Sequence, residues 1–371
     1  MSRKLEFLSV SLIVLVGFFS RFWLLAGQIE AIMALSGVIG VFGLYLLARE
    51  LYNRRIALIT ASLVSFSFWH ILVSRLGTVE ILVSTILVFL FYFLWRGLRT
   101  SDVLPFIICG LLLGSTLYLS PLALVGFFVV IVVLVAHRQK IKRDYPQNKY
   151  EYLRNALARG LGVLILFTLL AGFPIGLNLY FQSSQFLNEN FNNSVFQTPT
   201  PFTNLLKNLG LNLAMFNFQG DINPDQNIPG SPQLFWLVGL FFLIGLINIA
   251  RDLFKYWQNH HHLALVPLLS ISWLIGGLLG VSFFGSGVNA RLAVIIAPVA
   301  YLMAAKGFWW AFLSLYRWID IRKGPHQAVF AVTATLILLL VAIGLYQYDR
   351  YFNQWASPAR LLESQDLENS L

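Results

Sequence analysis

Long apolar runs separated by short polar or basic turns repeat along the whole chain. Most of these runs approach the ~20 residues that an α-helix needs to span a bilayer. Because lipid cannot satisfy the hydrogen-bonding groups of the backbone, such runs form helices. The pattern therefore predicts an all-α polytopic membrane protein with about eleven transmembrane helices. The predicted spans cover residues 5–26, 31–48, 56–75, 79–95, 104–119, 121–137, 159–180, 233–250, 263–284, 290–308 and 328–346.

The composition excludes an ordinary soluble protein. Of the 371 residues, 58% are hydrophobic and only 11% are charged, whereas soluble domains carry about a quarter charged residues. Because the spans follow each other closely, we expect residues 1–346 to form one transmembrane domain and residues 347–371 to form a tail outside it. The single cysteine, Cys109, excludes an internal disulfide.

Basic residues fall on alternate turns of the predicted bundle. If the N-terminus is placed inside, 19 of the 26 lysines and arginines lie on that side. The positive-inside rule then predicts a multi-pass protein of the cell membrane, with a cytoplasmic N-terminus and an extracytoplasmic loop 181–232 and C-terminal tail. Basic turns facing membrane lipids explain the net charge of +10 without a nucleic-acid partner. The linker 138–159 could bind lipid headgroups, but ordinary stop-transfer charge is the favoured interpretation.

The loop 181–232 is the longest polar segment of the predicted outer face, and we expect an amphipathic helix over residues 201–218 inside it. Thr200 is a suitable N-cap, and Pro201 fits the first helical position. This helix is expected to lie on the outer leaflet and to bring the turn-rich segment 219–230 to the mouth of the bundle. Its two faces carry apolar Phe202, Leu205, Leu206, Leu209, Leu213 and Phe216 and polar Thr203, Asn204, Lys207, Asn208 and Asn212.

Charged and polar residues at the outer span ends are the candidates for chemistry. Arg75 and Glu80 bracket one outward turn, Arg291 opens the tenth span, and Asp221 and Asn227 come from the long loop. Charges at membrane depth are expensive and usually mark a site or pathway. Guanidinium groups match phosphate oxygens in a bidentate way, so the two arginines could hold a lipid-linked phosphate. The alternative is that both arginines snorkel to headgroups and that Glu80 pairs with Arg75 by proximity.

Two further outer residues have more than one interpretation. His70 is either a substrate contact or, as we favour, a membrane-interface residue beside Trp69. Trp69 and Trp95 fall near predicted span ends with five other tryptophans, as interfacial aromatics do. Glu30 could act as a base, but a charge at the start of the second helix is the favoured interpretation.

Signatures of cofactor and metal sites are missing from the sequence. There is no phosphate-cradling glycine-rich loop, and the only histidine cluster is His260-His261-His262. Adjacent residues on a helix point in different directions, so these three converge poorly on one metal. We therefore predict no cofactor and no metal site, although a divalent metal is not excluded.

Four stretches, in order along nearly the whole chain, resemble segments of the C-type membrane glycosyltransferases of the family 39 and protein-mannosyltransferase-like group. They are Leu46–Arg55, Trp69–Gly77, Met215–Gly230 and Asn289–Arg291. The resemblance implies a polytopic fold and transfer of a sugar from a polyprenyl-phosphate donor to an acceptor at the outer face. It makes Arg75 and Arg291 candidate donor-phosphate ligands and places Glu80, Asp221, Asn227 and His70 among the substrate-binding candidates.

The first outer loop departs from the family pattern. In the family this loop is long and carries an acidic motif whose aspartate would act as the catalytic base. Here Arg21 runs within a few residues into the second span, so no residue inherits that role, and Asp221 and Glu30 are the only weak candidates. Three hypotheses follow: an active glycosyltransferase, an inactive family member that binds lipid-linked sugar or a partner, and a transporter or flippase. We rank the third last, because few acidic residues lie within spans and no inverted repeat is visible.

Overall fold

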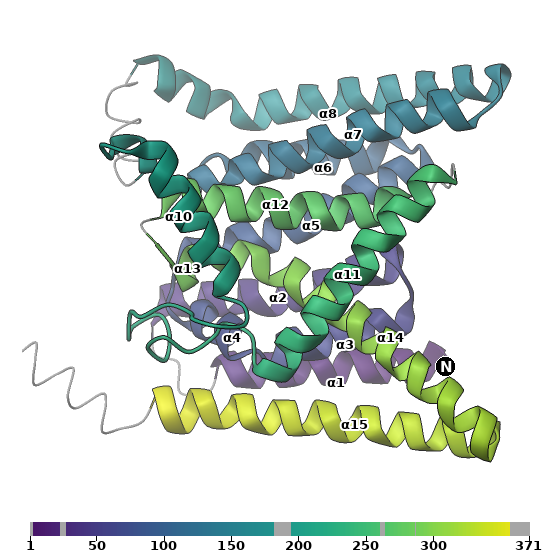
Figure 1. The fold of residues 1–371 in the computed structure, drawn as a ribbon. Coiled ribbons are helices and arrows are strands. Elements are labelled where there is room, and N and C mark those ends of the chain that lie inside the picture. The colour runs from purple at the N-terminus through teal and green to yellow at the C-terminus, as the bar shows by residue number, and fades with distance from the viewer. Residues whose placement is uncertain (1–2, 23–26, 182–193, 260–263, 286, 357–371) are drawn as a thin grey trace, which may run out of the picture.

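The computed structural model describes residues 3–22, 27–181, 194–259, 264–285 and 287–356, and its regular elements are all helical in these ranges. Most of the long helices run side by side in one bundle (Figure 1). In the first half these are α1 (Arg3–Phe22), α2 (Gln28–Leu51), α3 (Arg54–Phe66), α4 (Phe68–Arg75), α5 (Val79–Thr100), α6 (Val103–Thr116), α7 (Leu124–Asp144) and α8 (Gln147–Phe181). In the second half they are α10 (Pro201–Ala214), α11 (Trp236–Gln258), α12 (Leu265–Phe284), α13 (Ala290–Ala293), α14 (Ala297–Lys323) and α15 (Pro325–Asp349). Short 3-10 turns cover Pro121–Ala123, Val195–Gln197 and Val294–Ile296.

The predicted all-α polytopic fold is confirmed. Within the described ranges, nine helices are long and apolar enough to cross a membrane. The pair α3 and α4 would add a tenth span, and α6 is a shorter apolar helix. Each of the eleven predicted segments therefore corresponds to a helical element.

A buried serine explains why one predicted span is broken in two. Ser67 ends α3, and its hydroxyl accepts a hydrogen bond from the backbone N–H of His70 at 3.1 Å. This is an N-cap, which satisfies a backbone donor that a new helix leaves open. The chain consequently bends by 56° between α3 and α4. The bend turns α4 across the bundle, where its residues can reach both α13 and the end of α15.

The basic linker predicted over residues 138–159 is largely helical. Helix α7 continues to Asp144, and α8 begins again at Gln147 and runs for 35 residues. Only Tyr145 and Pro146 break the helix. The prediction of a loop was wrong because hydropathy marks where a helix leaves the lipid and not where its hydrogen bonding ends.

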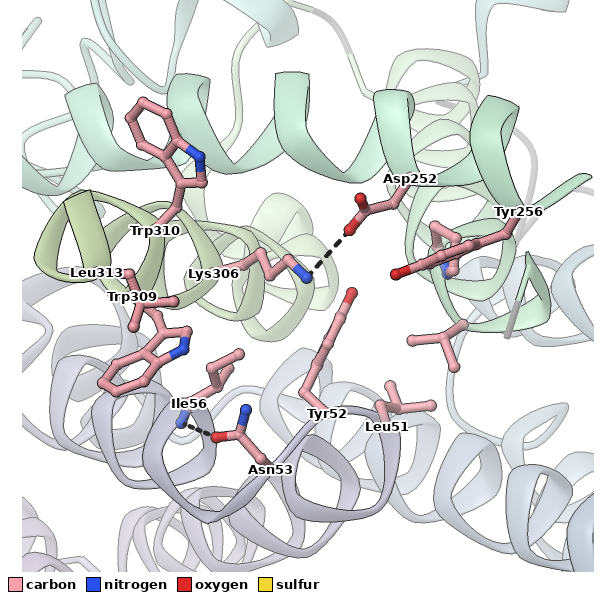
Figure 2. A pocket seen from close by; sticks show the side chains of 12 residues that line it. Leu51, Tyr52, Asn53, Ile56, Asp252, Tyr256, Lys306, Trp309, Trp310 and Leu313 are labelled. Carbon is pink, nitrogen blue, oxygen red and sulfur yellow. Dashed lines mark hydrogen bonds and ion pairs between the residues drawn. The ribbon is translucent and has the colours of Figure 1, made fainter. Parts of the chain in front are cut away.

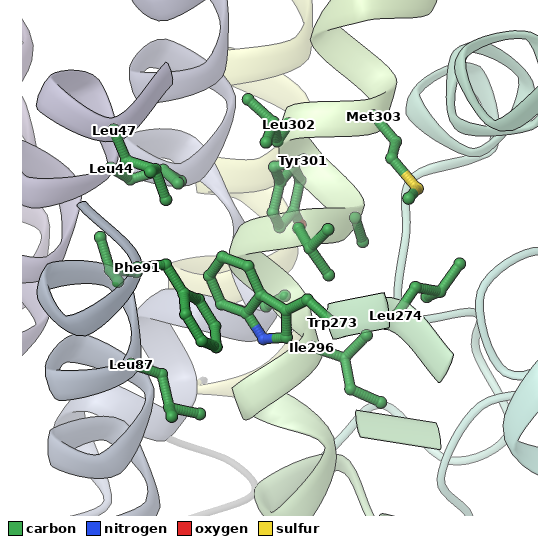
Figure 3. Packing of buried hydrophobic residues seen from close by; sticks show 14 of the residues in the cluster. Leu44, Leu47, Leu87, Phe91, Trp273, Leu274, Ile296, Tyr301, Leu302 and Met303 are labelled. Carbon is green, nitrogen blue, oxygen red and sulfur yellow. The ribbon is translucent and has the colours of Figure 1, made fainter. Parts of the chain in front are cut away.

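The hydrophobic core lies where α2, α5, α12 and α14 meet (Figure 3). At its centre Phe91 and Trp273 pack edge to face, with ring centroids 4.7 Å apart. The indole N–H of Trp273 donates to the backbone oxygen of Ile295 at 3.0 Å, so the buried polar atom has a partner. This contact ties α12 to the turn that leads into α14.

Helices α11 and α14 cross at a pair of glycines. A Cβ atom at Gly307 would overlap the carbonyl oxygen of Phe241, and one at Gly245 would overlap that of Met303. Small residues that let two backbones approach in this way are a common feature of packed membrane helices. The crossing fixes α14 against α11 and so positions the segments at both ends of α14.

The two ends of the bundle differ in character. The N-terminus of α1 lies at one end, whereas α10, α13 and the loop 215–235 gather at the other, which we call the site end (Figure 1). The last helix does not stop at residue 346: α15 continues to Asp349 and a π-helical turn covers Arg350–Trp355. Tyr351 packs in this turn against Phe68 of α4. Residues 347–355 are thus part of the bundle, contrary to the predicted free tail, and the rest of that tail lies outside the described residues.

Candidate functional site at one end of the bundle

The backbone of Ala290 joins three segments that are far apart in the sequence. Its N–H donates to Oδ2 of Asp221 at 2.8 Å. Its carbonyl oxygen accepts a hydrogen bond from the indole N–H of Trp69 at 2.7 Å. The loop after α10, helix α4 and the start of α13 therefore meet at one point of the site end. These are three of the four stretches that suggested the resemblance, and the fourth, Leu46–Arg55, includes the turn between α2 and α3.

Asp221 and Asn227 hold the loop together. The second carboxylate oxygen of Asp221 accepts from the backbone N–H of Asn223 at 2.8 Å. The amide of Asn227 donates to the backbone oxygens of Asp221 at 3.0 Å and of Ser231 at 2.7 Å. Both side chains are buried. With both oxygens of Asp221 engaged by backbone donors, the structural role of this carboxylate is clear, and it is poorly placed to accept a proton from a substrate.

Arg291 and Glu80 form an ion pair across the site end. The Nε of Arg291 lies 3.4 Å from Oε1 of Glu80. The arginine side chain is 42% exposed, whereas that of Glu80 is 8% exposed. The alternative that Glu80 pairs with Arg75 was wrong: Glu80 lies in the first turn of α5, after the turn at Gly77, and pairs with Arg291 of α13. The pair leaves one guanidinium edge accessible beside a buried carboxylate.

Arg75 faces the end of α1 instead. Its guanidinium donates to the backbone oxygens of Ser20 at 3.5 Å and of Arg21 at 3.2 Å. It also lies over the ring of Tyr351, 5.3 Å from the ring centre. Carbonyl groups at a helix C-terminus attract cations. Arg75 thus occupies a partly buried position between α1, α4 and the end of α15.

An apolar cavity of about 300 Å³ lies between α1, α3, α4 and α15. Its walls include Leu345, Phe352 and Ile71, which lies four residues before Arg75, and its few polar lining residues include Ser20. Ser20 is also the residue whose carbonyl Arg75 binds. Arg75 therefore binds one residue of the cavity wall, and the lining of this cavity suits a hydrocarbon chain.

A buried arginine escaped the sequence-based prediction. Arg21 is fully buried in α1 and donates to the ring Nδ1 of His70 at 2.7 Å and to the backbone oxygen of Gly17 at 2.8 Å. A guanidinium has only donors, so the imidazole nitrogen must be the acceptor. The signal was present, because an ionisable residue in an apolar run is a functional candidate by default. His70 and Trp69 are buried, so the interpretation of both as membrane-interface residues was wrong, and the same holds for buried Trp95.

Glu30 lies in the first turn of α2, as the favoured interpretation expected. Its side chain rests against Gly77: a Cβ atom there would lie 3.3 Å from Cγ of Glu30. Gly77 has a φ of +69°, which glycine adopts readily, and it forms the turn between α4 and α5. Glu30 therefore packs against a residue that follows Arg75 by two positions in the chain. Its side chain is only partly buried.

The predicted surface helix forms, and part of its polar face packs on the protein. Helix α10 begins at Pro201 after Thr200, although the Thr200 side chain makes no capping bond, and it ends at Ala214. Its polar residues Asn208 and Asn212 are buried against the end of α12. Asn208 donates to the backbone oxygen of Gly285 at 2.8 Å, and Asn212 donates to the hydroxyl of Ser282 at 3.1 Å.

The apolar face of α10 is correspondingly turned outward. Phe202, Leu206 and Leu213 are exposed. Carbonyls at the C-terminal end of α12 need donors, and the two asparagines supply them. The helix therefore offers these hydrophobic side chains to the surroundings.

Arg350 is a second buried cation that the sequence did not single out. Its guanidinium donates to the hydroxyl of Ser231 at 2.6 Å and lies over the ring of Phe68, 4.7 Å from its centre. Trp355 donates its indole N–H to the backbone oxygen of Pro224 at 2.9 Å. The end of α15 is thus fastened to the loop 215–235.

Metal-ligating side chains do not cluster at the site end. Among the described residues, no group of three or more histidines, cysteines, aspartates or glutamates could hold an ion. The histidine triplet at 260–262 lies outside them. What the site end offers is two arginines, the partly buried Arg75 and the more exposed Arg291, with Glu80 paired to Arg291 and Glu30 packed against Gly77.

These features define a multi-pass helical membrane protein in which segments far apart in the sequence meet at the site end. Residues 24–171 match the model of the family described as dolichyl-phosphate-mannose-protein mannosyltransferase. This match confirms, over that part of the chain, the resemblance inferred from the sequence. No curated protein sequence matches the chain.

Solved structures of membrane transferases are also similar to the chain. The oligosaccharyltransferase of Archaeoglobus fulgidus in its apo form has a TM-score of 0.48 and 14% identity, covering 86% of this chain and 45% of its own. The archaeal oligosaccharyltransferase AglB from Archaeoglobus fulgidus, in complex with an inhibitory peptide and a dolichol-phosphate, has a TM-score of 0.48 and 13% identity. The match covers 87% of this chain and 44% of AglB. ArnT from Cupriavidus metallidurans bound to undecaprenyl phosphate has a TM-score of 0.48 and 16% identity. The match covers 92% of this chain and 63% of ArnT. The chain thus spans less than half the length of the archaeal enzyme.

Proposed function

We propose that the protein transfers a sugar from a polyprenyl-phosphate donor to an acceptor at the site end of the bundle. One observation carries this proposal. Three family-like stretches converge on Ala290, and they bring Arg75, Arg291 and two carboxylates to the same end. The family match over residues 24–171 includes Glu30, Arg75 and Glu80.

The donor lipid would lie in the cavity between α1 and α15. A polyprenyl chain is apolar, and the cavity beside Arg75 is lined mainly by hydrocarbon side chains. The phosphate would then reach the guanidinium of Arg75, for which its oxygens are a good bidentate match. Arg291, held by Glu80, supplies a second cation for the sugar-phosphate linkage. In this arrangement the arginines stabilise the phosphate that leaves with the prenyl chain.

Glu30 is our candidate for the general base. It would take the proton of the acceptor hydroxyl as the acceptor oxygen bonds to the anomeric carbon. The bond from that carbon to the phosphate oxygen breaks, and polyprenyl phosphate leaves with the electron pair. The other two candidates at this end are engaged, because Asp221 binds two backbone N–H groups and Glu80 pairs with Arg291. Asp221 and Asn227 shape the pocket by holding the loop in place.

The orientation in the membrane follows from the distribution of charge. We infer that the N-terminus is cytoplasmic and that the site end, with α10 and the end of α15, is extracytoplasmic. The basic residues Arg49, Arg54 and Arg55 cluster near the end of the bundle where α1 begins: Arg49 and Arg54 pair there with Glu6. Residues 1–355 would form one transmembrane domain. His70 acts in it through Arg21 and not by touching substrate.

The test is sugar transfer by the purified protein in lipid nanodiscs. Polyprenyl-phosphate hexoses with a labelled sugar would be supplied with candidate acceptors, and release of polyprenyl phosphate would be measured with transfer of the label. We expect release that depends on acceptor and is lost in Arg75→Ala. Donor binding without release, for every donor and acceptor tried, would contradict catalysis and favour an inactive, lipid-binding family member. Movement of intact donor across vesicle membranes would favour a flippase instead.

A further inference from the structure

A second cavity lies at the end of the bundle opposite the proposed donor site. It has a volume of about 340 Å³ and is formed by the turn between α2 and α3, the last turns of α11, the first turn of α12, and α14 (Figure 2). It borders Tyr52 and Asn53 of the stretch Leu46–Arg55, the one family-like stretch that the site end does not use. Nothing in the sugar-transfer proposal requires this cavity.

Three polar groups converge on the cavity. The ammonium of Lys306 and the hydroxyls of Tyr52 and Tyr256 all point toward its centre (Figure 2). The Nζ of Lys306 lies 3.1 Å from Oδ2 of Asp252 and 4.8 Å from the centre of the Tyr52 ring. Burial raises the pKa of the Tyr52 hydroxyl above its usual value, so this group stays a neutral hydrogen-bond donor. The cavity thus presents one cation, one anion and hydroxyl donors within a few ångströms.

Aromatic rings form the opposite wall. Trp309 and Trp310 of α14 line the cavity, and Trp310 is 44% exposed. The guanidinium of Arg55 lies over the ring of Trp309, 5.1 Å from its centre. Tryptophan at this depth is typical of the level of lipid headgroups. Apolar side chains, including Ile56 and Leu313, complete the lining.

The balance of charge selects among possible occupants. A purely anionic group would meet the cation of Lys306 but also the carboxylate of Asp252, which repels it. A purely cationic group would be attracted by Asp252 but repelled by Lys306. A ligand with a phosphate and a primary ammonium can satisfy both, with the phosphate toward Lys306 and the ammonium toward Asp252 and the Tyr52 ring. Aromatic faces also attract ammonium groups.

We propose that this cavity binds the headgroup of a zwitterionic aminophospholipid, of the phosphoethanolamine type, from the leaflet at this end. The phosphate pairs with Lys306, and the ammonium donates to Asp252. The acyl chains leave past the exposed ring of Trp310 into the bilayer. Bound there, the lipid fastens the α2–α3 turn to α11 and α14. The inference is independent of sugar transfer at the site end.

Native mass spectrometry of the full chain tests the proposal. The protein would be delipidated in mild detergent and titrated with phospholipids that share acyl chains: phosphatidylethanolamine, its mono- and dimethyl derivatives, phosphatidylcholine and phosphatidylglycerol. We expect phosphatidylethanolamine to bind about tenfold tighter than phosphatidylcholine and phosphatidylglycerol, since a charge-assisted hydrogen bond is lost in both. Equal binding of the series by the wild-type chain would overturn the proposal without any variant.

Variants then test which lipid group each charged residue, Asp252 and Lys306, binds. Asp252→Asn should abolish the preference for phosphatidylethanolamine over phosphatidylglycerol, because the unpaired Lys306 favours an anion. Lys306→Gln should weaken all phospholipids. Glu50→Gln is the matched control, since Glu50 pairs with Arg99 at 3.0 Å outside the cavity lining. An unchanged preference in Asp252→Asn would overturn the assignment, as would full competition by soluble glycerophosphoethanolamine, which would point to a soluble ligand.

Discussion

The carboxylate of Asp221 binds the backbone N–H of Ala290 at 2.8 Å, and this single contact fastens the loop after α10 to the start of α13. The carbonyl oxygen of the same residue, in the next peptide unit, accepts a hydrogen bond from the indole N–H of Trp69. From the sequence alone, an aspartate in a polar loop near a membrane site would be interpreted as a catalytic acid. In the structure it is buried and has backbone donors on both oxygens.

The first prediction concerns this anchor. Asp221→Asn should lower the free energy of unfolding by about 1–3 kcal/mol, because the amide nitrogen must face a backbone N–H that then lacks an acceptor. Thermal unfolding in detergent, followed by circular dichroism, measures the change. Asp225→Asn is the control, because that side chain is exposed. Normal stability with lost activity would instead make Asp221 a catalytic group.

The second prediction concerns the buried pair of Arg21 and His70. His70→Leu should cost about 1–3 kcal/mol of stability, since the guanidinium loses its acceptor at 2.7 Å while remaining buried. The double variant Arg21→Met with His70→Leu should be less destabilised than the sum of the two single variants, because it removes the charge that needs the acceptor. Additive losses in unfolding experiments would contradict this coupling.

The third prediction concerns the crossing of α11 and α14. Gly307→Ala should destabilise the protein by about 1–3 kcal/mol, because the added methyl group overlaps the carbonyl oxygen of Phe241 and forces the helices apart. Gly210→Ala in α10 is the matched control, since a Cβ atom there meets nothing within 4 Å. Equal melting temperatures of the two variants would show that the crossing is not tightly packed.

Much of the architecture was readable from the sequence. The apolar runs gave all eleven helical segments, because a bilayer leaves the backbone few alternatives. The pattern of apolar and polar residues did not show how each helix is rotated about its axis, and so which of its faces packs against a neighbour. Helical spacing showed that α10 has two faces, but not that Asn208 and Asn212 would cap the end of α12. For the same reason the sequence could not identify the partner of Glu80: the choice between Arg75 and Arg291 depends on how α5 faces α13.

The site was predicted in part. Arg75 and Arg291 were found because charges near span ends stand out. Arg21 and Arg350 were missed as site residues. Arg21 stood out as a charge in an apolar run, but the partners of both arginines come from segments far away in the chain: His70 for Arg21, and Phe68 with Ser231 for Arg350. The break at Ser67 was likewise invisible, since one serine in an apolar run carries no distinct signal until its hydroxyl is seen to cap α4.

The fourth prediction tests the proposed base. Glu30→Gln should lower the rate of sugar transfer by about 10²–10⁴-fold, the range typical of a lost general base. Binding of the donor lipid should stay within a few-fold of the wild-type value, because Arg75 is unchanged. Glu50→Gln at the other end of α2 should leave the rate intact. If Glu30→Gln transfers sugar normally, the base is another group.

The central claim is that the site end holds a polyprenyl phosphate through Arg75. The most direct measurement is the affinity of the purified chain for polyprenyl phosphate compared with the uncharged polyprenol, by native mass spectrometry. Wild-type protein should bind the phosphate about tenfold tighter than the alcohol, Arg75→Ala should lose this preference, and Lys207→Ala, which removes an exposed cation of α10, should keep it. Equal binding of the two lipids by the wild type, or an unchanged preference in Arg75→Ala, would contradict the account.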